Sequence, residues 1–206
     1  IEGASRAIDN FCNRPDGFEA ADNFTARFYS GTGRAFLLID ECVEISEVAV
    51  KDSVTDTAYT AWDTPTTMLA GDGDWIPFSG DRENPDFNSL PYDSLMVDPN
   101  GDESVFTSGD FTDPFARTTQ RITSTGRMVP TVRVTAKWGY SINVPDSIKE
   151  ACIMQASIWY KRLEGSMASN LANLELGELE LFKTLDPAVE LILRLGRYIR
   201  PATGRR

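Results

Sequence analysis

Carboxylates are the side chains of this protein with the widest chemical scope, because its 206 residues include 31 Asp and Glu and no histidine. Histidine is the commonest general base, the usual partner of a serine or cysteine nucleophile and the commonest zinc ligand. Its absence excludes most hydrolase and metalloenzyme designs and leaves the chemistry that carboxylates can do alone. The composition points away from catalysis, and we expect a protein that is not an enzyme.

One acidic segment has the beginning of a calcium-binding loop. Asp98, Asn100 and Asp102 place side-chain oxygens at the first, third and fifth positions. An EF-hand loop also needs Gly at the sixth position and a bidentate Glu at the twelfth, where this chain has Glu103 and Gly109. The pattern fails, so an acidic turn is the better interpretation. We predict no catalytic, cofactor-binding or metal-ligating residue and no cofactor.

The three cysteines, Cys12, Cys42 and Cys152, are far apart and form no C-x-x-C motif. This spacing favours buried thiols in a reducing compartment over a disulfide scaffold. No stretch approaches the roughly 20 apolar residues of a membrane helix, and the first residues show no signal peptide. We therefore expect no membrane partner.

The net charge of −11 is unevenly distributed. Residues 40–113 hold 18 acidic side chains against Lys51 and Arg82, a net of −16, whereas residues 191–206 hold five arginines and no acid, a net of +5. Such asymmetry indicates partners more than a fold. No aromatic residues are interleaved with the arginines as in nucleic-acid binding, so an acidic protein neighbour is the better interpretation, beside the alternative of a solvated basic face.

Both ends of the chain have the apolar periodicity of helices. Residues 1–13 carry one apolar face and are followed by Pro15, which cannot continue a helix. A second helix is predicted over 146–163, with Asn143 as its N-cap and an end at Gly165. Asp186 is expected to be the N-cap of a last helix, which starts at Pro187 and runs to residue 200.

Between these helices the pattern changes to short strands with turn signals. Residues 131–138 alternate most clearly, residues 43–50 slip by one at Glu47, which indicates a bulge, and residues 64–114 are rich in loop formers. The sequence predicts an α+β fold: a small helical bundle formed by both chain ends, with an inserted antiparallel β-sandwich or barrel-like domain. The expected parts are an N-terminal helix in 1–22, a β domain in 23–139, a helical domain in 140–200 and a basic tail in 201–206.

Three segments then stand in a particular order: the opening helix over residues 1–10, a central segment, and a last helix leading to Tyr198-Ile199-Arg200. The central segment has a strand ending in Trp138-Gly139-Tyr140, the link Val144-Pro145, and an Ala-containing helix that ends in aromatic and basic residues by Arg162. Together they resemble the head–tail connector (adaptor) proteins of tailed bacteriophages. The resemblance covers about half of the chain.

The resemblance implies a structural role. Adaptors of this family form a homo-oligomeric ring, usually of twelve subunits, beneath the portal protein. The ring extends the DNA channel and offers a docking platform for the stopper or tail protein. Double-stranded DNA passes through without specific binding, and the subunit belongs to the neck of a virion that is assembled in the bacterial cytoplasm.

The same resemblance assigns partner-binding residues. The family's C-terminal segment reaches the portal, so the candidate portal-binding residues here are Arg194, Arg197, Tyr198, Arg200, Arg205 and Arg206. Aromatic residues beside a domain junction are expected to pack against a neighbouring subunit or within the core, and these are Trp138, Tyr140 and Trp159.

Two alternatives remain. A carboxylate-dependent phage glycosidase needs only a pair of Asp or Glu residues, so the lack of histidine does not exclude it. Another neck or tail-terminator subunit would follow a similar assembly plan.

Overall fold

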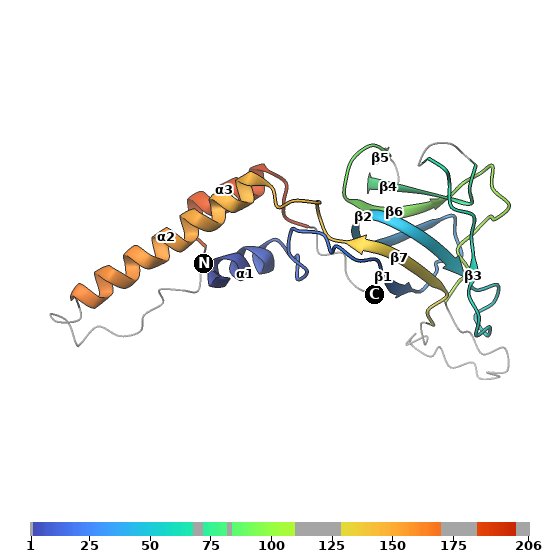
Figure 1. Cartoon of the computed structure of the whole chain (residues 1–206), viewed down its shortest axis with the longest axis horizontal. Coiled ribbons are helices and arrows are strands. Elements are labelled where there is room, and N and C mark those ends of the chain that lie inside the picture. The colour runs from blue at the N-terminus through green and yellow to red at the C-terminus, as the bar shows by residue number, and fades with distance from the viewer. Residues whose placement is uncertain (1, 68–71, 82–83, 110–128, 170–184, 201–206) are drawn as a thin grey trace, which may run out of the picture. The chain divides into compact units, whose positions relative to one another are not determined.

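The structure is a computed structural model that describes residues 2–67, 72–81, 84–109, 129–169 and 185–200. These residues form three helices and an antiparallel sheet of seven strands (Figure 1), so the expected mixed α+β class is confirmed. The chain divides into two compact units. The helical unit comprises Ile1–Glu19 and Asn143–Arg206, and the sheet unit comprises Ala20–Ile142.

The helical unit contains α1 (Glu2–Phe11), α2 (Asp146–Ser169) and α3 (Pro187–Leu195). Helix α1 packs against α2, and α2 packs against α3. The apolar periodicity of α1 and α3 explains this, because each of these two helices buries one apolar face. The buried apolar side chains that the helices contribute are Ala4, Ile8, Ile148, Ala151, Val189 and Leu193.

The helix ends differ from the prediction at several points. Helix α1 ends at Phe11 and not at residue 13, and helix α2 begins at Asp146, so the residue before it is Pro145 and not the predicted N-cap Asn143. Helix α3 begins as expected, since the Asp186 side chain accepts a hydrogen bond from the amide of Ala188 and Pro187 stands in the first turn. It ends at Leu195, however, and not at residue 200, because Gly196 is the C-cap. Helix α2 continues past Gly165 to Ser169, since one glycine inside a helix costs only about 1 kcal/mol.

The sheet has the order β1-β7-β2-β6-β4-β5, with β3 paired to β2 outside this path (Figure 1). Residues 64–114 are predicted to be rich in loops, and most of the described residues there do lie outside strands, but three of these strands lie there as well. These strands have buried apolar side chains such as Trp75 and Leu95. Pro, Gly and Asp residues interrupt the apolar–polar alternation that would mark the strands in the sequence. The strands are β1 (Thr25–Tyr29), β2 (Phe36–Val50), β3 (Thr60–Ala61), β4 (Trp75–Asp81), β5 (Asn84–Asp86), β6 (Tyr92–Val97) and β7 (Val132–Trp138).

Strand β2 is the longest of the described strands and pairs with both β6 and β7. Its first half pairs with β6 up to Cys42, and its second half pairs with β7 from Cys42 to Val50. The pairing with β7 shifts register between Ile45 and Glu47, which confirms the predicted bulge. Bulges bend a strand and increase its twist. The described strands therefore form one open, bulged sheet, where two packed sheets or a barrel-like closure had been expected.

The core of the sheet unit lies on one face of β2, β6 and β7. Strand β7 has the predicted alternation, with Val132, Val134, Ala136 and Trp138 all buried. Trp62, Trp75 and Phe106 add large aromatic side chains to the same cluster. None of the helices in the described part of the chain is long and apolar enough to span a membrane.

Candidate functional site

Four of the six predicted portal-binding residues lie at the end of α3, and Arg205 and Arg206 lie outside the described residues. The side chain of Arg194 is 62% exposed, pairs with Glu190 at 3.7 Å and lies over the ring of Phe11. Arg197 is exposed. Tyr198 and Arg200 are only half-exposed. The described portal-binding candidates therefore differ in exposure, with Arg194 and Arg197 the more accessible two.

The last turn of α3 ends in a Schellman motif. The amide of Tyr198 donates to the carbonyl of Leu193, and the amide of Arg197 donates to the carbonyl of Arg194. Arg197 adopts a left-handed φ of +55°, the conformation this motif requires just beyond the C-cap. The motif turns the chain sharply, so the Tyr198 ring lies back over Gly196, where a Cβ atom would collide with it.

Helix α1 ends in the same way. The amide of Arg14 donates to the carbonyl of Asp9, and the amide of Asn13 donates to the carbonyl of Asn10. Asn13 has a φ of +56°, and asparagine tolerates this region better than most residues. Both helices thus satisfy their last carbonyl groups with the chain that follows them.

The two helix ends are joined by hydrogen bonds in both directions. The Nε of Arg14 donates to the carbonyl oxygen of Tyr198 at 2.9 Å, and the amide of Arg200 donates to the carbonyl of Cys12 at 3.0 Å. Arg14 is buried, with 5% of its surface exposed. An unsatisfied buried cation would be costly, so this bond and its stacking over the Phe18 ring, 5.3 Å from the centroid, explain why an arginine is tolerated there.

The Tyr198 side chain completes this arrangement. Its ring meets Phe18 edge to face with centroids 5.9 Å apart, and its hydroxyl shares a hydrogen bond of 2.5 Å with the hydroxyl of Ser147 at the start of α2. We call the set Arg14, Phe18, Ser147 and Tyr198 the clasp. No sequence pattern indicated it, because its members are up to 184 residues apart.

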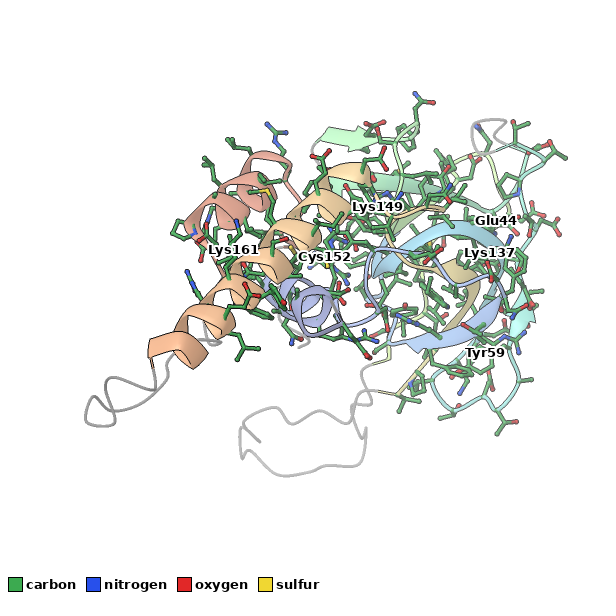
Figure 2. All side chains as sticks on the ribbon, turned by 60° about the vertical axis from the view of Figure 1, so that its left-hand side comes forward. Glu44, Tyr59, Lys137, Lys149, Cys152 and Lys161 are labelled. Carbon is green, nitrogen blue, oxygen red and sulfur yellow. The ribbon has the colours of Figure 1, made fainter. Side chains whose placement is uncertain are left out.

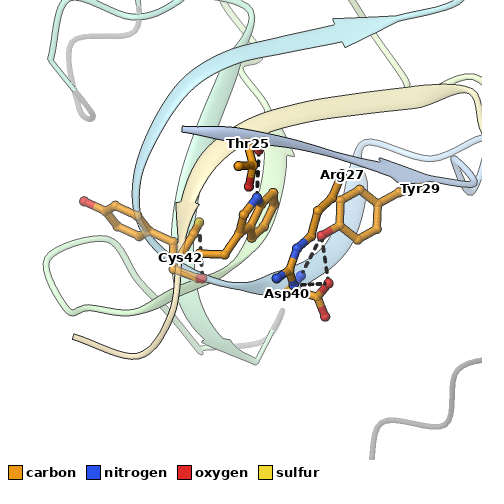
Figure 3. A network of polar contacts seen from close by, with 7 residues as sticks. Thr25, Arg27, Tyr29, Asp40 and Cys42 are labelled. Atoms are coloured by element: carbon orange, nitrogen blue, oxygen red, sulfur yellow. Dashed lines mark hydrogen bonds and ion pairs between the residues drawn. The ribbon is translucent and has the colours of Figure 1, made fainter. Parts of the chain in front are cut away.

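The predicted subunit-packing residue Trp138 lies in the core of the sheet unit, 3% exposed. Its indole Nε1 donates to the carbonyl of Thr25 at 2.8 Å (Figure 3). The Arg27 guanidinium lies 4.7 Å from its ring centroid and pairs with Asp40 at 2.9 Å. Packing between subunits remains a prediction for this residue, whose own unit covers nearly all of its surface.

A network of polar contacts surrounds this tryptophan. The Tyr29 hydroxyl donates to the Asp40 carboxylate at 3.1 Å and accepts from the Asp40 amide (Figure 3). Burial, together with the neighbouring Asp40 charge, raises the pKa of Tyr29 well above its ordinary range. The phenol therefore stays protonated and acts as a donor, which indicates a structural role in joining β1 to β2.

Strand β7 carries two partly exposed cations that pair with carboxylates of β2. Lys137 pairs with Glu44 at 2.7 Å and lies over the ring of Phe24. Arg133 pairs with Glu47 at 2.6 Å. Figure 2 shows Lys137 and Glu44 next to each other on this face. Each of these two cations already has a carboxylate partner.

The other two predicted aromatic residues lie at partly exposed positions. Tyr140 follows β7 and is half-buried. Trp159 is a half-buried residue of α2, and its ring lies against Gly3 of α1, where an added Cβ atom would be 3.8 Å away. The small residues at this end of α1 allow the large ring to fit between the helices.

An apolar groove of about 560 Å³ runs beside Trp159 within the helical unit. Helix α2 contributes most of its lining, and Lys161, labelled in Figure 2, stands at its polar margin. The exposed fractions of Ile153 and Tyr160 are 63% and 61%, unusually high for side chains of this size. The lining residues are Gly3, Ala4, Ile153, Ala156, Ser157, Trp159, Tyr160, Lys161 and Leu163.

The acidic loops of the sheet unit use carboxylates to hold backbone amides. Asp74 accepts from the amides of Asp63 and Asp102, and Asp98 accepts from the amide of Asn100. The Asp98 bond is that of an acidic turn, as expected for the segment that begins like a calcium loop, whereas the Asp74 bonds join separate loops. Among the residues that the structure describes, no group of three or more His, Cys, Asp or Glu is placed to hold a metal ion.

One carboxyl group in these loops is perturbed. Burial, followed by the nearby charges of Asp74, Asp52 and Asp102, raises the pKa of Glu103. The adjoining acidic pocket has a volume of about 170 Å³, which is below the roughly 300 Å³ of small ligand sites.

Comparison of the chain with protein-family models, curated proteins and solved structures finds no match in any of the three.

Proposed function

We propose that this chain is a structural, non-enzymatic subunit of a tailed-bacteriophage neck, an adaptor that forms a ring under the portal. In this proposal the ring extends the DNA channel and carries the stopper or tail protein. The protein would belong to the virion and would be assembled in the cytoplasm of the bacterial host.

The proposal rests mainly on one observation: the helical unit is built from both ends of the chain. Residues 1–19 and 143–206 fall in one compact unit, and residues 20–142 form a separate one between them. The segments that resemble adaptors in sequence are the two helical ends and strand β7. The finer fold, a small bundle closed by both chain ends with the sheet unit as an insertion, is part of this proposal.

The exposed apolar side chains of the helical unit support assembly with further copies. Five of them, at 37–75% exposure, lie on α2 and α3 besides Tyr160. Of these side chains, Ile153, Tyr160 and Leu163 line one apolar groove, and a large exposed apolar patch on a folded unit usually marks an interface. A ring needs two different patches on each subunit that fit each other. The five are Ile153, Met154, Leu163, Leu191 and Leu195.

The acidic segment 40–113 has a role in the same proposal. Carboxylates that face a channel would repel DNA phosphates and keep the DNA from adhering, whereas carboxylates that face outward would serve solubility. Asp56 and Asp102 are exposed. Replacing both by Asn should slow DNA ejection at low salt if they line the channel, and unchanged ejection at every salt concentration would place them outside it.

The mass of the assembled protein tests the proposal. The purified chain, alone and mixed with the portal protein of the same phage, is examined by native mass spectrometry and electron microscopy. We expect a closed ring of about ten or more copies bound to the portal. A chain that stays monomeric and does not bind the portal under any condition contradicts the proposal.

The glycosidase alternative has a direct test of its own. Release of reducing sugar from host cell-wall polysaccharide would favour it, and Glu103→Gln would then abolish the activity. The small volume of the acidic pocket beside Glu103 argues against this reading. A different neck or tail-terminator subunit would assemble into a ring but would bind a partner other than the portal.

A further inference from the structure

Strand β1 forms one edge of the sheet. It pairs with β7, and no second strand among the described residues pairs with it (Figure 1). Such an edge presents a row of amide and carbonyl groups to which another strand can bind, and proteins usually protect it with proline, a bulge or an outward charge. Strand β1 pairs with β7 in regular register, contains no proline, and has Arg27 as its only charged residue.

The charge of Arg27 is held inside the sheet unit. Its guanidinium pairs with Asp40 of β2 at 2.9 Å and lies 4.7 Å from the ring centroid of Trp138 (Figure 3). A cation used in this way does not repel a strand that approaches the edge. None of the usual protective features is therefore present in β1.

The hydrogen bonds of β1 show which of its backbone groups face the edge. The carbonyl of Tyr29 accepts from the amide of Thr131, and the carbonyl of Thr25 accepts from the indole of Trp138, so both are used on the β7 side. Residues of an antiparallel strand alternate in the side to which their backbone groups point. The amides and carbonyls of Ala26 and Phe28 therefore point away from β7.

The side chains along this edge read the same in both directions. Phe24, Ala26 and Phe28 alternate along the chain and so share one face of the sheet. Phe24 is 40% exposed, Phe28 is 56% exposed, and Ala26 between them is exposed as well. In an antiparallel pair of two β1 strands centred on Ala26, each Phe24 would stand opposite Phe28 of the other copy. Aromatic pairs opposite each other stabilise a sheet.

The charges beside the edge are compatible with this pairing. Lys137 lies 4.8 Å from the ring centroid of Phe24, and Arg133 is in register with Phe28. In the paired sheet the β7 cations of the two copies would be three strands apart, about 14 Å, which exceeds the Debye length of about 8 Å. Arg27 would stand opposite Thr25 of the other copy. Two chains of net charge −11 can thus meet here without contact between like charges.

We infer that two copies of this chain pair through their β1 strands, antiparallel and centred on Ala26, so that their sheets become continuous. The contact is smaller than the roughly 1,200 Å² of a stable interface, so we expect a dissociation constant on the order of 0.1 mM. A two-fold contact does not close a ring. The inference is therefore independent of the ring contact in the proposed function.

Disulfide cross-linking tests the register of the pairing. The full chain carries Cys152→Ser, because Cys152 is the one cysteine that is not buried, and receives a single new cysteine. Ala26→Cys places two thiols directly opposite each other, with Cα atoms about 5.5 Å apart, a separation that a disulfide spans. Thr25→Cys is the register control, because its thiols would be diagonal and about 7–8 Å apart. Ala61→Cys is the surface control, since Ala61 is an exposed residue of β3.

We expect a mild oxidant to cross-link Ala26→Cys at least fivefold faster than either control. Sedimentation velocity provides a second measurement without cysteines. Ala26→Asp places two carboxylates opposite each other and should weaken the dimer at least tenfold. Its thermal midpoint should stay within about 2 °C, because Ala26 is exposed. Ala61→Asp is the matched control and should change neither quantity.

Three outcomes would overturn the inference. Cross-linking of Ala26→Cys no faster than Ala61→Cys would show that the edges do not meet, as when another segment of the chain or another protein covers them. Equal cross-linking of Thr25→Cys and Ala26→Cys would exclude this register. Unchanged dimerisation of Ala26→Asp would place the contact elsewhere. Rings on the portal that form equally in Ala26→Asp concern the proposed function alone, and the cross-linking decides the pairing whether or not rings form.

Discussion

Arg14 and Tyr198 occupy equivalent positions at the ends of two helices, and the side chain of the first donates to the backbone of the second at 2.9 Å. Each is the second residue beyond a C-cap, and the amide of each closes a Schellman motif by bonding the carbonyl five residues earlier. The two motifs point their chains toward each other. The result is that residues near both ends of the chain share one hydrogen-bonded junction.

The left-handed residue in each motif gives a first prediction. Arg197 has a φ of +55°, and in this conformation its Cβ atom crowds the following carbonyl oxygen. Glycine has no Cβ atom and adopts the same conformation without steric cost. We expect Arg197→Gly to raise the free energy of unfolding by roughly 0.5–1 kcal/mol, measured by urea denaturation. Asn13→Gly is the matched control, and its gain should be smaller because asparagine tolerates the same region. A loss of stability in Arg197→Gly would mean that the arginine side chain stabilises the fold.

A second prediction concerns the buried carboxyl of Asp9. Burial raises its pKa above the ordinary 3.8, and the neighbouring Arg6 acts in the opposite direction. The folded protein therefore holds this proton to a higher pH than the unfolded chain does, so the group lowers stability as the pH rises through this interval. Above it the penalty is complete.

Asp9→Asn should remove that penalty. We expect its free energy of unfolding at pH 7 to exceed that of the unaltered protein by roughly 0.5–1 kcal/mol. At pH 3 the difference should vanish. The lost pair with Arg6 counts for little, since the Arg6 side chain is 66% exposed. Urea denaturation at both pH values measures this, and a variant less stable at pH 7 would show that the ionised carboxylate is favourable.

A third prediction ranks the thiols by reactivity. Burial raises the pKa of Cys12 to about 11 and that of Cys42 to about 12. Only the thiolate is nucleophilic, so at pH 8 about one Cys12 in a thousand is reactive even when reagent reaches it. Cys152 is half-buried. We expect iodoacetamide to modify Cys152 first, as peptide mass spectrometry would show.

Denatured protein is the control for this ranking, and there all three cysteines should react at similar rates. Modification of Cys12 in the folded protein as fast as Cys152 would indicate that the junction of α1 with the C-terminal segment opens readily, because the Cys12 carbonyl accepts from Arg200.

Local signals in the sequence predicted part of this fold. The Asp186-Pro187 pair marks the start of α3, and alternation over residues 131–138 marks β7. Both features depend on neighbouring residues alone, through a helix cap in the first case and the two-residue period of a strand in the second. The bulge in β2 was predicted for the same reason.

The rest depends on contacts that the sequence does not encode locally. Helix α3 ends at Leu195 because Gly196 is its C-cap and the chain turns at Arg197, and arginine is a poor indicator of a left-handed turn. The clasp joins Phe18 and Ser147 to Tyr198 across most of the chain, so no spacing marks it. The resemblance implies Tyr198 as a portal-binding residue together with the arginines around it, whereas its contacts with Phe18 and Ser147 depend on tertiary packing.

The last prediction concerns the apolar groove of the helical unit, defined above by its nine lining residues. Ile153 and Tyr160 line it and expose more than half of their surface. Because these side chains are already in contact with water, their truncation removes little burial from the folded subunit. If the groove receives a second copy, as a ring requires, truncation removes contact area at the interface instead.

Ile153→Ser combined with Tyr160→Ala should therefore leave the thermal midpoint of the isolated subunit within about 2 °C while weakening assembly at least tenfold. Sedimentation velocity over a range of protein concentrations, with and without portal, measures the second effect. Lys149→Ala is the matched control, since this exposed residue of α2 does not line the groove. If the double variant forms rings as stable as those of the unaltered protein, the groove is not the main contact between subunits, because large side chains at the centre of an interface supply most of its affinity.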